Sequence, residues 1–146
     1  MDWPAALLAA VVLPAAALGL GLWWRSQAGR VAAASGDSAA ADLGLASAAL
    51  GTSATLVQFS TEYCSRCPST ARQLTAIAAD YAGVAHVELD LSRRPDLADR
   101  FRILQTPTTL ILDAGGTASA RIGGVPDALA VRRHLDTLTR SSRVPS

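Results

Sequence analysis

The sequence predicts an α/β domain, a mixed sheet flanked by helices, preceded by one N-terminal transmembrane helix. An unbroken apolar block opens the chain, and short β-rich runs alternate with amphipathic stretches from about residue 54. With 146 residues the chain has room for one domain and accessory segments. We therefore expect a transmembrane anchor at 1–25, a flexible Ala/Ser/Gly linker at 26–52, the folded domain at 53–142 and a tail at 143–146.

The composition excludes some classes of partner. The net charge is +1 and the charged residues are scattered, so we expect no nucleic-acid partner. All thirteen basic residues are Arg, and Ala occurs thirty times. We attribute this to a genome-wide coding bias, as a hypothesis, and do not count the Ala content as evidence for helix.

The N-terminal block is long enough to cross a membrane. No charged residue occurs from Trp3 to Trp24, and about 20 apolar residues suffice for a spanning helix. Trp24 followed by Arg25 is typical of an interfacial anchor. The alternative is a cleavable signal peptide, which begins with basic residues, whereas the charged residue here is Asp2. We expect a single-pass cell-membrane protein held by residues 3–24.

The basic flanks of this block predict its orientation. Arg25 and Arg30 follow the block and no basic residue precedes it, so the positive-inside rule places the domain in the cytoplasm. The alternative is an extracytoplasmic domain.

The domain is predicted to follow the order β-α-β-α-β-β-α. The turn Asp113–Gly116 has the composition of a hairpin. The expected strands are 55–60, 84–90, 108–112 and 117–122, and the expected helices follow Cys67 to about residue 81, run from Pro95 to about 101, and from about 126 to 140.

The two cysteines, Cys64 and Cys67, are separated by two residues and lie between a predicted strand and a predicted helix. A helix N-terminus stabilises an anion, so a thiolate is favoured there. Cys64 is expected to be the exposed member and Cys67 the buried one. Ser65 and Arg66 lie between them as candidate pKa-tuning residues, and the charge of Arg66 is predicted to lower the pKa of Cys64.

A second motif, Thr106-Pro107, directly precedes an apolar strand. With the strand–Cys-x-x-Cys–helix unit, the Gly-Gly hairpin and the final amphipathic helix, it resembles the thioredoxin superfamily over roughly residues 52 to 140. The resemblance implies a cis peptide bond before Pro107, with Thr106 and Pro107 offering a binding edge to an extended substrate segment. Gly123 resembles the glycine that follows the last strand in that family.

The sequence departs from the family pattern near the cysteines. Gln58 stands where thioredoxins often have a buried Asp, and Tyr63 replaces the usual Trp. Ser65 and Arg66 replace the usual Gly-Pro. Tyr63 either flanks the substrate groove or covers the disulfide. These departures favour a specialised member over a general-purpose thioredoxin.

The cysteine pair is compatible with two other kinds of function. A Cys-x-x-Cys pair also forms half of a zinc site, but zinc needs four ligands, and His86 and His134 form no second pair, so we expect no metal site. A redox-sensing or adaptor module would use the same disulfide without turnover.

We expect a protein thiol–disulfide oxidoreductase, a reductase if cytoplasmic, in which Cys64 attacks a partner disulfide and Cys67 resolves the intermediate. Outside the cytoplasm it would serve cytochrome maturation or disulfide formation. No dissolved cofactor is required. The partners are a disulfide-containing protein and an electron donor.

Overall fold

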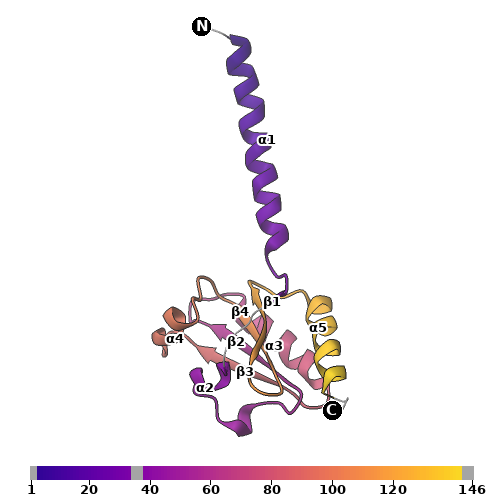
Figure 1. The fold of residues 1–146 in the computed structure, drawn as a ribbon. Helices are drawn as coiled ribbons and strands as arrows, with labels where there is room; N and C mark the ends of the chain where they lie inside the picture. The colour runs from indigo at the N-terminus through magenta and orange to yellow at the C-terminus, as the bar shows by residue number, and fades with distance from the viewer. Residues whose placement is uncertain (1–2, 34–37, 143–146) are drawn as a thin grey trace.

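A computed structural model describes residues 3–33 and 38–142 of the chain (Figure 1). A long helix stands on an α/β domain. The strands are β1 (Ala32–Ala33), β2 (Ala54–Ser60), β3 (Val84–Asp90), β4 (Thr108–Asp113) and β5 (Ala118–Gly123). The helices are α1 (Trp3–Gln27), α2 (Ala39–Asp42), the 3-10 turn η1 (Ser47–Ala49), α3 (Cys67–Ala79), α4 (Pro95–Arg100) and α5 (Ala128–Ser141).

The sheet is mixed, as the sequence predicts. Its strands lie in the order β1-β5-β4-β2-β3, with β2 parallel to β3 and antiparallel to β4. The predicted hairpin joins β4 to β5. Its turn requires Gly116, whose φ of 78° lies in the left-handed region, and the Asp113 carboxylate accepts hydrogen bonds from the backbone N–H groups of Gly115 and Thr117.

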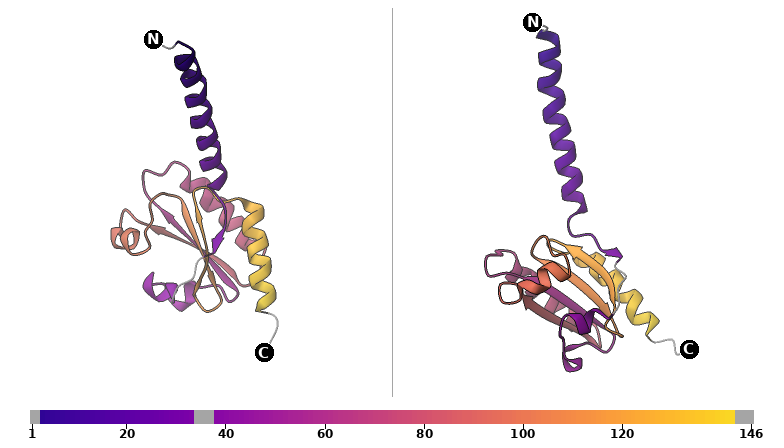
Figure 2. Two further views of the ribbon diagram at one scale, coloured as in Figure 1. Left: turned by 45° about the horizontal axis from the view of Figure 1, so that its top comes forward. Right: turned by 60° about the vertical axis from the view of Figure 1, so that its left-hand side comes forward.

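Helices cover both faces of the sheet (Figure 2). The core consists of two hydrophobic clusters, one on each face of the sheet, and β2 contributes to both because successive side chains of a strand point to opposite faces. Leu56 belongs to the cluster that includes Leu74 of α3 and Leu135 of α5. Val57 belongs to the other cluster, which includes Leu97 of α4. Every residue of β2 is buried, and the loop that carries the cysteines follows its last residue, Ser60.

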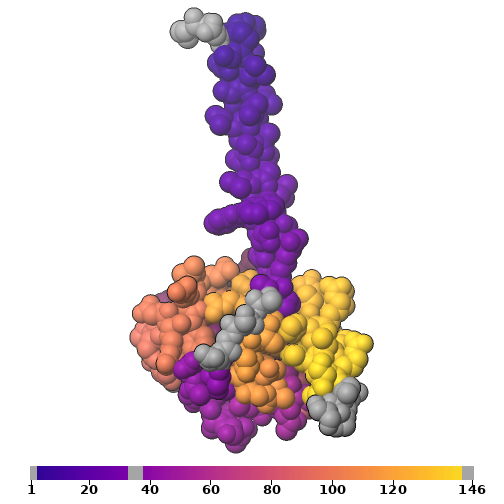
Figure 3. Space-filling model, viewed as in Figure 1, coloured from indigo at the N-terminus to yellow at the C-terminus, as the bar shows by residue number. Residues whose placement is uncertain are grey.

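The helix α1 carries no buried residue and projects away from the domain (Figure 3). At about 1.5 Å per residue its 25 residues span about 37 Å, more than the roughly 30 Å hydrocarbon core. Its mean hydropathy over 18 residues is 2.3. By length and composition α1 is a candidate membrane span, and a signal sequence has the same properties.

The segment predicted as a flexible linker, 26–52, holds β1, α2 and η1 and packs on the domain. Ala32 and Ala33 pair with β5, and Leu43, the C-cap residue of α2, is 1% exposed within the core cluster that includes Leu97 of α4. Scattered Leu side chains and small Ala residues provide this packing without any periodic pattern, so the composition of the segment does not reveal it. Residues 34–37 of this segment and the predicted tail at 143–146 lie outside the described residues.

Candidate active site

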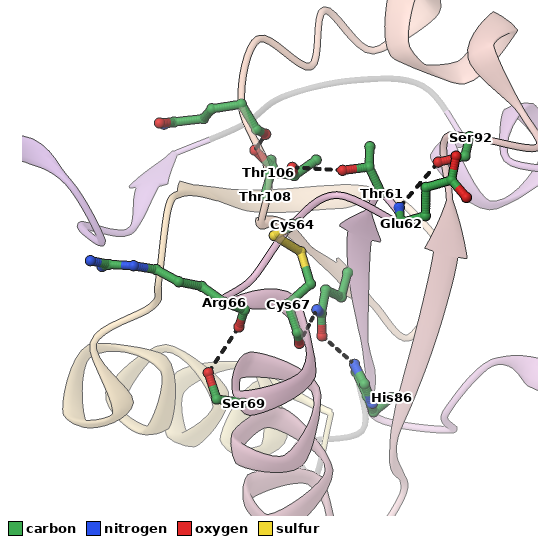
Figure 4. The surroundings of a disulfide bond; sticks show 12 residues. Thr61, Glu62, Cys64, Arg66, Cys67, Ser69, His86, Ser92, Thr106 and Thr108 are labelled. Atoms are coloured by element: carbon green, nitrogen blue, oxygen red, sulfur yellow. Dashed lines mark hydrogen bonds between the residues drawn. A yellow bond between two sulfur atoms is a disulfide. The ribbon is translucent and has the colours of Figure 1, made fainter.

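Cys64 and Cys67 are joined by a disulfide at the end of β2 (Figure 4). Their Cα atoms lie 5.5 Å apart. Cys67 is 2% exposed, whereas Cys64 is half-buried and lines a surface pocket. The two sulfurs are therefore unequal, because solvent and a partner can approach Cys64 and are kept from Cys67.

The helix α3 begins at Cys67, with Arg66 as its N-cap residue and Pro68 in the first turn. The missing N–H of Pro68 costs nothing there, since first-turn N–H groups have no helical partner. The carbonyl of Arg66 accepts hydrogen bonds from the Thr70 N–H at 3.0 Å and the Ser69 hydroxyl at 2.9 Å. The disulfide thus lies at a helix N-terminus, where the helix dipole favours a thiolate.

The Thr106–Pro107 peptide bond is cis, the isomer that the resemblance implies. Pro107 is buried, and its carbonyl accepts a hydrogen bond from the Gly124 N–H at 2.8 Å. The hydroxyls of Thr106 and Thr61 lie 3.3 Å apart, which joins the cis-proline loop to the cysteine loop. The two motifs that are about forty residues apart in the sequence meet at one site.

The rim of the site is polar and open. Tyr63 is 89% exposed, so it flanks the pocket and does not cover the disulfide. Arg66 is exposed, and its side chain extends away from the sulfur atoms (Figure 4). The pocket beside Cys64 is lined by Thr61, Tyr63, Cys64, Ser65, Arg66 and Thr106.

A chain of hydrogen bonds lies beneath the disulfide. The Gln58 side chain is fully buried, and its Nε2 donates to the Cys67 carbonyl at 3.0 Å. The Gln58 Oε1 lies 3.2 Å from Nε2 of His86, and His86 Nδ1 lies 2.9 Å from the Thr75 hydroxyl. Because the amide nitrogen faces Cys67, its oxygen must accept, so neutral His86 carries its proton on Nε2 and Nδ1 accepts from Thr75.

Burial lowers the pKa of His86, and the nearby Glu88 carboxylate opposes this by raising it. The buried amide and the histidine are both neutral in this arrangement. The side chain that lies beneath Cys67 is therefore the amide of Gln58, a group that cannot ionise.

Sequence reasoning missed two residues of the site. Thr61 follows β2 and carries no motif that would single it out. His86 was considered only as a zinc ligand, but its ring is held by Gln58 and Thr75. The contact between His86 and Gln58 depends on the register of the parallel pairing of β2 with β3, which cannot be read from the sequence.

The second histidine lies elsewhere. His134 of α5 is 3.0 Å from the Ser119 hydroxyl, and burial lowers its pKa. Among residues 3–33 and 38–142 no three His, Cys, Asp or Glu side chains gather into a cation site.

The fold and the paired cysteines define a thioredoxin-like α/β protein with a disulfide of the redox-active type. The thioredoxin family model matches residues 47–135. The chain belongs to the thioredoxin family, which supports thiol–disulfide oxidoreductase chemistry at the family level.

Individual relatives agree with this assignment. The chain is 31% identical over 72 residues to thioredoxin of Staphylococcus aureus, covering 49% of this chain and 69% of that protein. Chloroplastic thioredoxin z is similar in structure, with a TM-score of 0.53 and 28% identity over 61% of this chain and 80% of its own. A mutant thioredoxin from Halobacterium salinarum has a TM-score of 0.53 at 19% identity over 64% of this chain and 80% of its own, which shows the fold alone.

Proposed function

We propose that this protein is a membrane-tethered protein thiol–disulfide oxidoreductase in which Cys64 is the nucleophile and Cys67 the resolving thiol. The observation that carries the proposal is the unequal burial of the two sulfurs, in a chain of the thioredoxin family. Cys64 faces a pocket that it shares with Thr106, whereas Cys67 is enclosed.

The exchange proceeds in two balanced steps. In the reduced protein the Cys64 thiolate attacks one sulfur of a substrate disulfide, forms a mixed disulfide and releases the other substrate sulfur as a thiolate. The Cys67 thiolate then attacks the Cys64 sulfur, which forms the Cys64–Cys67 disulfide and releases the second substrate thiolate. Two electrons pass to the substrate, and an external dithiol donor must return them. Thr106 and Pro107 offer the edge against which an extended substrate segment lies, and Tyr63 flanks it.

We propose that α1 holds the protein in the membrane as a retained single span. Its length, its lack of buried side chains and Trp24 followed by Arg25 support this. Arg25 and Arg30 favour a cytoplasmic domain, where the pair would be kept reduced and act as a reductase.

Insulin reduction tests the enzymatic part of the proposal. The full chain in detergent, with dithiothreitol as donor, is expected to accelerate precipitation of the insulin B chain. Cys64→Ser should abolish the acceleration, and Ser141→Ala, at an exposed position at the end of α5, is the control that should retain it. An inactive wild-type protein with a normally folded domain would favour the alternative, a redox-sensing or adaptor module.

The topology is tested by a reporter fused after Ser146 that is active on one side of the membrane only. A signal on the cytoplasmic side is expected. A signal on the other side would favour an extracytoplasmic thiol–disulfide protein, and cleavage after α1 would contradict the retained anchor.

A further inference from the structure

The anchor enters the domain next to the cis-proline loop. Gly29, two residues after the end of α1, donates its N–H to the carbonyl of Gly123 at 2.9 Å. Gly124, which follows Gly123 in the chain, donates its N–H to the carbonyl of the cis-proline Pro107 at 2.8 Å. On the other side the Gly29 carbonyl accepts from the Asp127 N–H at 3.3 Å. The anchor is thus joined to the substrate edge by two backbone hydrogen bonds.

Gly29 has little room to move from this position. It is buried with a φ of 78°, and a Cβ there would lie 2.6 Å from the carbonyl oxygen of Val125. A positive φ and a close backbone contact both favour glycine. The docking of Gly29 is therefore a specific feature of the chain and not a loose linker contact.

The tether between membrane and domain is short. Only Ala28 separates the last helical residue, Gln27, from Gly29. An extended chain covers at most about 3.6 Å per residue, so Gly29 lies within roughly 12 Å of the level of Trp24. The headgroup layer of one leaflet is itself roughly 5 to 8 Å thick. If α1 spans the membrane, this end of the domain is held at the bilayer surface (Figure 1).

A continuous surface leads from the anchor to the disulfide. The groove at the base of α1 is lined by residues that include Trp24, Arg25, Leu104 and Gln105. A neighbouring pocket shares Leu104 and Gln105 and reaches Thr106. Thr106 in turn lines the pocket of Cys64. The substrate edge therefore opens toward the base of the anchor.

The chemistry of this groove suits a lipid–water boundary. The described residues that line it include Arg25, Arg30 and Arg121 and no carboxylate, which suits anionic headgroups. Leu104 is 95% exposed, so its side chain is free to contact a surface that faces the groove. The guanidinium of Arg121 donates to the carbonyl of Phe101 at 2.7 Å, which holds the loop that carries Leu104 in place.

We propose that the substrate is a membrane-bound protein whose disulfide lies close to the bilayer surface, within the span between the anchor and Cys64. This inference rests on the proposed function and adds the substrate class. A short tether docked on the domain keeps Cys64 from reaching sites far from the bilayer. A disulfide at the membrane surface therefore meets Cys64 more often than one held far above it.

Proteoliposomes containing the full chain test the proposal. Two single-span peptides carry the same disulfide loop, one directly after the span and one beyond a long Gly/Ser spacer, and free insulin is the third substrate. The loop next to the bilayer should be reduced at least about fivefold faster than the distant loop. A Gly/Ser insertion between Gln27 and Ala28 should remove this preference and leave insulin reduction unchanged. The matched control, the same insertion after Ser146, should keep the preference.

Equal rates for the two peptides, or a preference that survives the insertion after Gln27, would overturn the inference while leaving the oxidoreductase proposal in place. Failure of the wild-type protein to reduce insulin would instead overturn the proposed function on which the inference rests.

Discussion

The side-chain amide of Gln58 donates a hydrogen bond to the main-chain carbonyl of Cys67 at 3.0 Å, fully shielded from solvent. This bond joins the first residue of α3 to β2, an interior strand of the sheet. Gln58 is itself paired with Glu88 of β3 and Thr109 of β4. The buried sulfur is thus attached to a part of the backbone that is fixed on three strands.

Replacement of this amide should destabilise the oxidised protein. Gln58→Ala leaves the Cys67 carbonyl and the His86 ring without their partner, and an orphaned buried polar group costs about 1–3 kcal/mol. We expect the free energy of unfolding in urea to fall by about 2–3 kcal/mol. A loss below about 0.5 kcal/mol would show that the amide is not a structural tie.

Removal of another buried polar group, the hydroxyl of Thr109 opposite Gln58, should instead increase stability. The Thr109 hydroxyl is buried and has no hydrogen-bond partner among the described residues. Thr109→Val replaces it with a methyl group of the same shape, so we expect the unfolding free energy to rise by about 1 kcal/mol. Chemical denaturation measures this, and a clear loss of stability would mean that the hydroxyl has a partner.

Stability should decrease as the pH falls below neutrality. Burial lowers the pKa of His86 below its ordinary 6.5, while Glu88 on its own strand opposes this. The neighbours of its ring from β2 and α3 are the uncharged Gln58 and Thr75, and the charged residue of α3 one turn before Thr75 is the exposed Arg72.

The direction of this pH effect on stability follows from where the unfolded and the folded chain bind the proton. The unfolded chain takes up a proton near pH 6.5 and the folded chain only at lower pH, so stability is lost as the pH falls from about 6.5 toward the folded pKa. Urea midpoints at about pH 7.5 and about pH 5.5 measure this difference. His86→Gln should reduce it. Burial also lowers the pKa of His134, so this residue contributes to the pH dependence with the same sign. Stability should therefore depend least on pH in the double variant with His86→Gln and His134→Gln. A slope unchanged in His86→Gln would contradict the assignment.

The charge between the cysteines should favour the thiolate. In the reduced protein, Arg66→Ala removes a cation two residues from Cys64, so the pKa of Cys64 should rise and the pair should become less oxidising. The effect should be modest, because Arg66 is exposed and directed away from the sulfurs (Figure 4). Ultraviolet thiolate absorbance against pH measures it, with the exposed Arg72→Ala of α3 as control. An unchanged or lower pKa would remove this role.

The fold was largely predictable because its signals are local. The strand Val84–Asp90 and the hairpin at Asp113–Gly116 occur where composition and turn residues place them. The packing of 26–52 was not predictable, since β1 has two residues and α2 four, too few for any period.

The cysteine pair and Pro107 were identifiable from motif and resemblance. The contact of Gln58 with His86 was not, because it depends on strand register. Nor was the docking of Gly29 on Gly123, which joins segments far apart in the sequence by backbone atoms alone.

The most direct test of the account is to trap the mixed disulfide. Full-chain Cys67→Ser and Cys64→Ser proteins are each incubated with a peptide disulfide, and intact-mass spectrometry follows the adduct. We predict that Cys67→Ser accumulates a stable adduct on Cys64, because no resolving thiol remains, and that Cys64→Ser forms adduct at least about tenfold more slowly, because Cys67 is 2% exposed. Equal adduct formation by the two variants, or faster formation by Cys64→Ser, would contradict the assignment of Cys64 as the nucleophile.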